Sequence, residues 1–189
     1  MTPVAEINVV KRNGETTPLD LERVHHIVEH ACRGLAGVSE SAVEMNSGLQ
    51  FFDGIETKDI QEILIRSAND LITLDAPNYQ YVAARLLLFS LRKAVYQGHP
   101  DERPKLLDHV KKCVDLNVYD GSILTKFSDE EWDKLNSYID HDRDYLFTYA
   151  GIRQVVDKYL VQDRSTGEVY ETPQFMYVMI AATLFQDDD

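Results

Sequence analysis

The sequence predicts a mainly α-helical protein with a small β-hairpin near its N-terminus. Apolar residues repeat at helical spacing through most of the 189 residues, which predicts amphipathic helices. A short β-branched run ends at Asn13-Gly14, the strongest two-residue signal for a hairpin turn. The hairpin signal comes first and the helical periodicity follows it along the chain. The hairpin is therefore expected to cap a four-helix bundle, with more helices after that bundle.

The first half of the chain is expected to hold this hairpin and bundle. Ile7 to Lys11 forms the outgoing strand and Glu15 to Pro18 the returning one. Asp20 can cap the first helix, which ends near Gly34. The start signals of the other three helices are the capping-box pattern Ser41 to Glu44, Thr57 after a turn at 51–54, and Pro77 in a first turn.

Residues 98–104 predict a domain boundary, because they hold two prolines, a glycine and charges without periodicity. Residues 1–98 are therefore expected to form one domain, and residues 99–189 the incomplete helical start of a second. In that second part we expect helices over 105–116, 128–139, 145–160 and 175–185, and a hairpin over 161–171. The last helix is apolar almost all round, which is typical of a helix inside a larger body.

Charge and cysteine content exclude several classes of protein. The net charge of −13 disfavours a nucleic-acid groove, which needs a basic surface. The N-terminus has no apolar signal segment, and no apolar run reaches the roughly 18 residues of a membrane span. Cys32 and Cys113 have no CxxC partner, so neither a zinc ribbon nor a disulfide framework is expected, and a reducing cytoplasm fits best.

Basic residues of the first domain are the main candidates for ligand binding. Lys11 and Arg12 stand at the hairpin turn, Arg23 in the first helix, and Arg92-Lys93 at the end of the fourth. If the helices pack on the hairpin, these cations could converge on one anion, aided by the amides of a helix N-terminus. The competing interpretation is that they are solvated or satisfy the carbonyls of helix ends.

No pattern in the chain predicts an active site. His26 and His30 are spaced to share a metal on one helix face, but no third ligand is evident and surface histidines are the simpler interpretation. In Asp140 to Asp144 a histidine is flanked by carboxylates, and structural ion pairing is favoured because no nucleophile is adjacent. Glycine-rich phosphate loops and the GxSxG elbow are lacking from the sequence.

Several segments together resemble the ATP-cone domain of class I ribonucleoside-diphosphate reductase large subunits. The cone-like segments are Val9 to Gly14, Leu19 to Val24, Asp53 to Thr57, Tyr79 to Leu86 and Leu91 to Lys93. The segments Tyr138 to Asp144, Lys158 to Gln162 and Pro173 to Phe175 resemble the part of the same subunit that follows its cone. The resemblance covers nearly the whole chain.

The resemblance implies a set of nucleotide contacts. It places Lys11, Arg12, Arg23 and Lys93 on the phosphates, Thr57, Ile60 and Gln61 in the pocket lining, Val9 beside the base, and Thr17 and Asp20 on the adenine. Three of these positions depart from the family pattern. Close relatives have a longer carboxylate at position 17 and an amide at position 20, while Arg for Lys at position 23 keeps the charge and changes its geometry.

The resemblance also implies an allosteric role for the chain. In such cones ATP permits turnover and dATP suppresses it, with magnesium, by changing how subunits assemble. The two nucleotides must therefore favour different states, because a ligand with equal affinity for both would shift nothing. The parent enzyme reduces ribonucleoside diphosphates to deoxyribonucleotides for DNA synthesis, and its expected partners are the remainder of the large subunit and a radical-generating small subunit.

Catalysis is expected to belong to the parent enzyme, because Cys32 and Cys113 do not match the family's catalytic cysteines. Two other functions stay open from the residues alone. One is a freestanding nucleotide-sensing regulator built on an ATP-cone, which the acidic charge and the lack of a CxxC pair disfavour. The other is a helical interaction module without a ligand.

Overall fold

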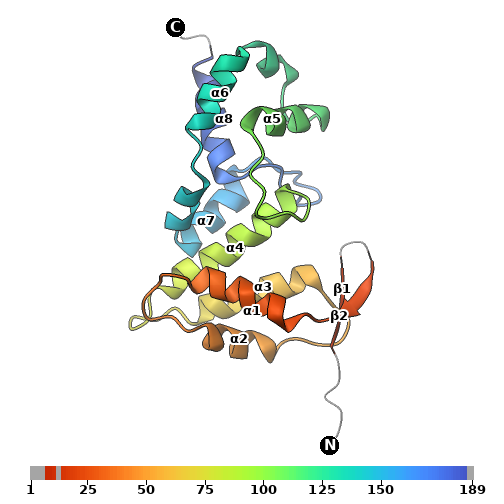
Figure 1. Ribbon diagram of the computed structural model, residues 1–189, viewed down its shortest axis with the longest axis vertical. Helices are drawn as coiled ribbons and strands as arrows, with labels where there is room; N and C mark the ends of the chain where they lie inside the picture. The colour runs from red at the N-terminus through yellow and green to blue at the C-terminus, as the bar shows by residue number, and fades with distance from the viewer. Residues whose placement is uncertain (1–6, 12–13, 187–189) are drawn as a thin grey trace, which may run out of the picture. The chain divides into compact units, whose positions relative to one another are not determined.

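The computed structural model describes residues 7–11 and 14–186 and shows a mainly helical chain with a small sheet, as predicted (Figure 1). The strands are β1 (Asn8–Val10), β2 (Thr16–Pro18) and β3 (Ile55–Glu56). The α-helices are α1 (Leu21–Cys32), α2 (Glu40–Gly48), α3 (Thr57–Asp70), α4 (Tyr79–Val95), α5 (Leu106–Asp115), α6 (Asp129–Ser137), α7 (Tyr149–Gln154) and α8 (Pro173–Leu184). The structure also contains three shorter helical segments: the 3-10 segments η1 (Gly121–Thr125) and η2 (His141–Leu146) and the π-helical turn η3 (Val155–Tyr159).

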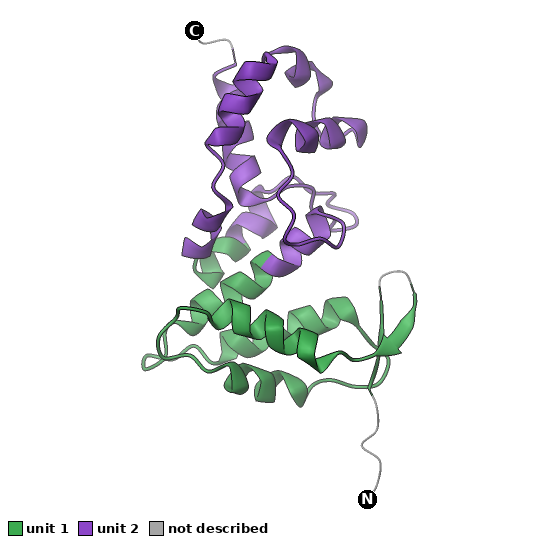
Figure 2. Cartoon of the chain, viewed as in Figure 1, with its two compact units in different colours: residues 1–88, 147–153 green, residues 89–146, 154–189 purple. Residues whose placement is uncertain are grey.

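The chain divides into two compact units (Figure 2). Unit 1 comprises residues 1–88 and 147–153, and unit 2 comprises residues 89–146 and 154–189. The division therefore falls inside α4, whose last turns belong to unit 2. A domain boundary near residue 98 stays a prediction.

The sheet of unit 1 has the strand order β2-β1-β3. β1 pairs antiparallel with β2, which confirms the hairpin, and parallel with β3, which the sequence did not predict. The turn at 51–54 leads directly into β3. Its last residue, Gly54, adopts a φ of 84° and donates its backbone N–H to the Asn8 carbonyl at 2.9 Å. That positive φ favours glycine and brings the start of α3 to the edge of the hairpin.

The first three helices pack alongside one another in unit 1, with α2 contacting both α1 and α3 (Figure 1). Their apolar faces follow the predicted spacing: the buried positions include Val24, Val28 and Ala31 of α1, Val43 of α2, and Ile60, Ile63, Leu64 and Ala68 of α3. α4 is tied to the end of α1, because the Arg85 guanidinium donates to the carbonyls of Ala31 at 3.1 Å and Arg33 at 2.7 Å. A basic side chain thus satisfies helix carbonyls that would otherwise lack partners.

Helix starts in unit 1 agree with the sequence at one site and differ at three. Asp20 caps α1, since its Oδ1 accepts from the Arg23 backbone N–H at 2.9 Å. The capping box predicted at Ser41 is wrong, because Ser39 is the cap of α2. Thr57 is the first residue of α3 and not its cap, and α4 begins at Tyr79, two residues after Pro77.

Unit 2 contains α5, α6, α8 and the last turns of α4, whereas all of α7 but its last residue belongs to unit 1. One helix predicted in this part of the chain is broken. The capping box at Ser128 and Glu131 is confirmed. The prediction of one continuous helix over 145–160 is wrong. The 3-10 segment η2 ends at Leu146, and α7 starts separately, where the Thr148 hydroxyl accepts the Gly151 backbone N–H at 3.3 Å. The hairpin predicted over 161–171 is reduced to one antiparallel bridge, between Gln162 and Val169.

The last helix, α8, is apolar on two faces. Phe175, Met176 and Met179 are buried, whereas Ile180 is 50% exposed and Leu184 is 71% exposed. Among the helices that the structure describes, none is both long and apolar enough to cross a membrane.

Candidate functional site

The small sheet places two candidate positions, Val9 and Thr17, in one row with Ile55. Val9, in the central strand, pairs with Thr17 of β2 on one side and with Ile55 of β3 on the other. Residues paired in this way direct their side chains to the same face of a sheet. Val9 and Ile55 are buried and Thr17 is half-buried, so the row lies at the edge of the core with one polar side chain.

Two helix N-termini adjoin this sheet and differ in how they are capped. α1 follows β2, and its cap Asp20 uses its carboxylate on the first turn. α3 follows β3 directly, and its cap residue Glu56 makes no side-chain capping bond. Within the part of the chain that the structure describes, the cap residue therefore gives the first-turn amides of α3 no side-chain acceptor, and these amides are suited to an anion or a hydroxyl. Thr57, half-buried, adds its own hydroxyl there.

One turn into α3, Gln61 has an unpaired polar atom. Its side chain is 7% exposed, and its Oε1 is buried without a hydrogen-bond partner among the residues that the structure describes. Leaving such an acceptor unpaired costs about 1–3 kcal/mol. The neighbouring Ile60 is also buried, at 4% exposure. A ligand with an amino or hydroxyl donor would satisfy the Gln61 oxygen.

The four candidate phosphate contacts are in different settings. Lys11 forms an exposed ion pair with Glu15 at 3.1 Å, and the Arg23 side chain is exposed. Arg12 lies outside the described residues. Lys93 is half-buried in the last turn of α4 and belongs to unit 2. The structure thus brings together Val9, Thr17 and the start of α3, while the convergence of the cations stays a prediction.

A side-chain contact that the sequence did not reveal fixes this arrangement. The Asp53 carboxylate accepts from the backbone N–H of Asn8 at 2.8 Å and from its side-chain amide at 3.0 Å. These two hydrogen bonds hold the pKa of Asp53 below its usual range. They tie the first strand to the turn before β3, so Asp53 positions the start of α3. The only sequence signal was the turn-forming pair Asp53-Gly54.

The two thiols are not poised for chemistry. Cys32 and Cys113 are both buried, and burial raises the pKa of each to about 11. Both therefore stay protonated near neutral pH, where a nucleophilic cysteine must be a thiolate. Among the described residues, no three His, Cys, Asp or Glu side chains form a group that could hold a metal ion. His26, one of the two histidines considered as metal ligands from the sequence, lies 3.4 Å from the Glu29 carboxylate.

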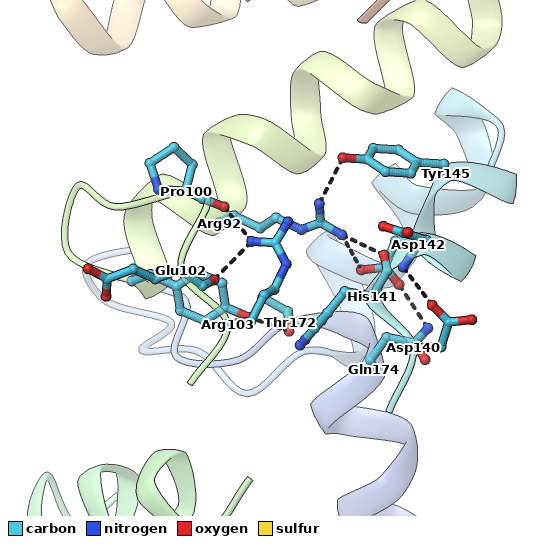
Figure 3. Close-up of polar contacts among 12 residues, drawn as sticks. Arg92, Pro100, Glu102, Arg103, Asp140, His141, Asp142, Tyr145, Thr172 and Gln174 are labelled. Atoms are coloured by element: carbon cyan, nitrogen blue, oxygen red, sulfur yellow. Dashed lines mark hydrogen bonds and ion pairs between the residues drawn. The ribbon is translucent and has the colours of Figure 1, made fainter. Parts of the chain in front are cut away.

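A buried polar cluster lies at the end of α4 in unit 2, and we call it the Arg92 cluster: Arg92, Asp144, Tyr145, Gln174 and the carbonyl of His141. Figure 3 shows Arg92 reaching from α4 toward Tyr145 and His141. The Arg92 Nη2 lies 3.1 Å from Asp144 Oδ2, and these side chains are 3% and 0% exposed. Structural ion pairing in the segment from Asp140 to Asp144 is therefore confirmed.

A cavity elsewhere in unit 2 is lined by no predicted site residue. It encloses about 500 Å³ and is lined by α8 and by Tyr119, Ile123 and Glu171 among others. Its polar wall is already satisfied, because Tyr119 donates to Glu171 and the Val161 N–H donates to the same carboxylate at 2.8 Å. Burial raises the pKa of both Tyr119 and Glu171.

Two family models match parts of the chain. The ATP cone domain family matches residues 7–94, and the family described as ribonucleotide reductase, all-alpha domain, matches residues 145–189. The alpha subunit of ribonucleoside-diphosphate reductase 1 from Escherichia coli K12 is 48% identical over 179 residues, which is 95% of this chain and 23% of the relative.

Two further relatives agree with this match. The ribonucleoside-diphosphate reductase alpha subunit of Haemophilus influenzae is 49% identical over 177 residues, covering 94% of this chain and 23% of the relative. That of Enterobacteria phage T4 is 41% identical over 184 residues, covering 96% and 24%. The chain thus spans about a quarter of the length of these relatives. It belongs to the ribonucleoside-diphosphate reductase alpha-subunit family and carries that family's ATP-cone domain.

Proposed function

We propose that this chain is the overall-activity module of a ribonucleotide reductase large subunit and that its cone binds ATP as an activator and dATP as an inhibitor. The parent enzyme then reduces ribonucleoside diphosphates, with the remainder of the large subunit and a radical-generating small subunit as its partners. Magnesium accompanies the triphosphate, and the oligomeric state of the parent follows the effector. The chain itself performs no reduction.

The observation that carries the proposal is the unpaired Gln61 Oε1 beside the start of α3 in a domain that matches the ATP cone family. A purine nucleoside offers the donors that this oxygen lacks, either the exocyclic amine of adenine or a ribose hydroxyl. The α3 amides without a side-chain cap favour a negatively charged or hydroxyl group, as a nucleotide provides. Val9 and Ile60 supply apolar surface for the base.

The phosphates are assigned to Lys11, Arg12, Arg23 and Lys93. Lys11 already has a carboxylate partner, so a triphosphate must compete with Glu15 for it. That exchange costs little, because exposed ion pairs contribute about 0–1 kcal/mol. Thr17 and Asp20 are assigned to the adenine edge, and Asp20 would do so while its Oδ1 caps α1.

Isothermal titration calorimetry of the 189-residue chain tests the proposal. We expect both ATP and dATP to bind with a dissociation constant of about 1 μM or below, equivalent to roughly −8 kcal/mol. Removal of magnesium with a chelator should weaken the binding. Absence of heat with either nucleotide at about millimolar concentration would contradict nucleotide binding by this cone.

The variant Lys93→Ala tests the phosphate assignment. Loss of a charge-assisted contact should weaken dATP binding by at least about 1.5 kcal/mol, which is roughly tenfold. Lys111→Ala is the matched control, since it removes the same charge from an exposed position of α5. Equal affinities for both variants would remove Lys93 from the site.

A further inference from the structure

We infer that the cavity of unit 2 is the docking site for a segment of the parent large subunit that carries a lysine or arginine among apolar residues, and that this cation pairs with Glu171. The inference rests on the proposed function, because the occupant belongs to the remainder of that subunit. Glu171 and Tyr119 lie in the cavity wall, and α8 supplies much of the remaining lining.

Glu171 is a buried acidic residue without a counter-ion among the residues that the structure describes. It is 2% exposed. The Tyr119 hydroxyl donates to its Oε2, and the Val161 backbone N–H donates to its Oε1 at 2.8 Å. These hydrogen bonds satisfy the carboxylate as an acceptor, but neither donor carries a positive charge. Because buried carboxylates are rarely left without a cation, a positive group is expected beside Glu171.

The charged groups of the cavity lining are all negative. Asp120 lines the cavity together with Glu171, and none of the described lining residues is a lysine, arginine or histidine. The Asp120 carboxylate caps η1, since its Oδ1 accepts from the Ser122 backbone N–H at 2.9 Å. Two carboxylates at one cavity give a negative local potential, which attracts a cation and repels an anion such as a nucleotide.

The rest of the lining is mainly apolar and continues onto an uncovered face of α8. Ile123, Met176 and Met179 are buried, whereas Ile180 and Leu184 also line the cavity and are exposed. A lysine or arginine suits such a surface, because its aliphatic stem packs on apolar side chains while its charged end reaches a carboxylate. The cavity therefore fits a cation with an apolar body.

The exposed apolar surface of α8 is larger than the cavity. Tyr177, Ile180 and Leu184 share one helix face, and Tyr177 is exposed although it does not line the cavity. A small organic cation would fill the cavity and leave this face uncovered, whereas a protein segment covers both. This chain is 23% of the length of the Escherichia coli relative, so the parent subunit contains ample polypeptide to provide such a segment.

The ionisation of Glu171 sets the sign of the expected effect. Burial raises the pKa of Glu171, and the hydrogen bonds from Tyr119 and Val161 oppose the rise. A carboxyl group whose folded pKa lies above its unfolded value costs stability, and the cost is present in full above the folded pKa. A cation beside Glu171 reverses this sign, because it favours the charged form in the folded protein.

Thermal unfolding of Glu171→Gln in the 189-residue chain and in the full-length large subunit tests the ion pair. Gln keeps the size and an acceptor but removes the charge. In the 189-residue chain the melting temperature should stay the same or rise, because an uncompensated charge is gone. In the full-length subunit it should fall by at least about 2 °C, because the cation of the occupant is left buried without its partner. Glu168→Gln makes the same change at an exposed position and should shift neither protein.

Thiol labelling of Ile180→Cys tests whether the cavity is covered, and it does not depend on how Glu171→Gln folds. In the 189-residue chain a maleimide should label the introduced thiol rapidly, because position 180 is half exposed. The native Cys32 and Cys113 are buried with pKa values raised to about 11, so they react slowly. In the full-length subunit, mass spectrometry of the peptide that carries position 180 should show labelling at least about tenfold slower.

The outcomes distinguish the possible occupants. Equal labelling rates in the two proteins would show that no segment covers the cavity. Slower labelling without a fall in melting temperature for Glu171→Gln would mean that the occupant brings no cation, and a fall without slower labelling would indicate a small cation. Labelling that slows as the concentration of the 189-residue chain rises would identify a second copy as the occupant. Each of these results overturns the inference. The proposed function is judged separately by dATP binding, because none of its assigned nucleotide contacts lines the cavity.

Discussion

Unit 2 holds a buried ion pair besides exposed ones such as Lys105 with Asp133, whereas the ion pairs described in unit 1 are exposed or partly exposed. In unit 1 the ion pairs lie at the surface: Lys11 and Glu15 are 44% and 55% exposed, and His25 lies 2.7 Å from Glu44 in a largely exposed pair. In unit 2 the Arg92 and Asp144 side chains are 3% and 0% exposed. Exposed charges can exchange partners for a ligand, whereas buried charges fix geometry. The difference suits unit 1 to binding and unit 2 to holding the end of α4.

The largest expected effect contrasts the two kinds of ion pair. Asp144→Ala should lower the free energy of unfolding by about 3–5 kcal/mol, because it leaves Arg92 buried without its counter-ion. Glu15→Ala should change it by less than about 1 kcal/mol, as expected for an exposed pair. Urea unfolding followed by circular dichroism measures both. Similar losses for the two variants would contradict the contrast.

Acid should destabilise unit 2 through its buried histidines. Burial lowers the pKa of His109 and of His141 to about 4. Between the unfolded value near 6.5 and about 4, the unfolded chain binds more protons than the folded one, so stability falls as pH falls through this window. For His109 the effect is at most about 3 kcal/mol.

His109→Phe isolates this contribution. The His109 ring stacks on Phe175 with ring centroids 4.3 Å apart, and a phenyl ring retains that contact without a titrating group. Thermal unfolding between pH 7 and pH 4.5 should show a weaker pH dependence for the variant. An unchanged acid slope would mean that His109 is not the buried group that takes up the proton.

The smallest effect has the opposite sign and lies in unit 1. The hydrogen bond to Glu44 raises the pKa of His25, with further help from the negative charge of Glu44. A raised folded pKa stabilises the protein below the unfolded pKa, and this contribution is lost as pH rises through the folded pKa. In an NMR titration Glu44→Gln should lower the pKa of His25, while Glu22→Gln should not. A pKa that does not respond to Glu44→Gln would show that the pair does not form.

The helices were predictable because their apolar residues repeat locally, as in α1 and α3. β3 was not, since two residues carry no periodicity and their pairing with β1 depends on Asp53 binding Asn8, 45 positions away. Thr148 broke a predicted helix because its hydroxyl accepts a backbone N–H that the helix would have used. For the site, the sequence indicated which residue types to consider, but the unpaired oxygen of Gln61 emerges only from packing.

The central claim is that the purine nucleotide binds in unit 1, at the sheet and the start of α3. An NMR titration of the ¹⁵N-labelled chain with dATP and magnesium tests this most directly. We expect the largest shifts at the backbone amides of Val9, Thr17 and Thr57 and at the side-chain amide of Gln61. Shifts confined to the residues that line the cavity of unit 2, such as Ile123 and Ile180, would contradict the claim.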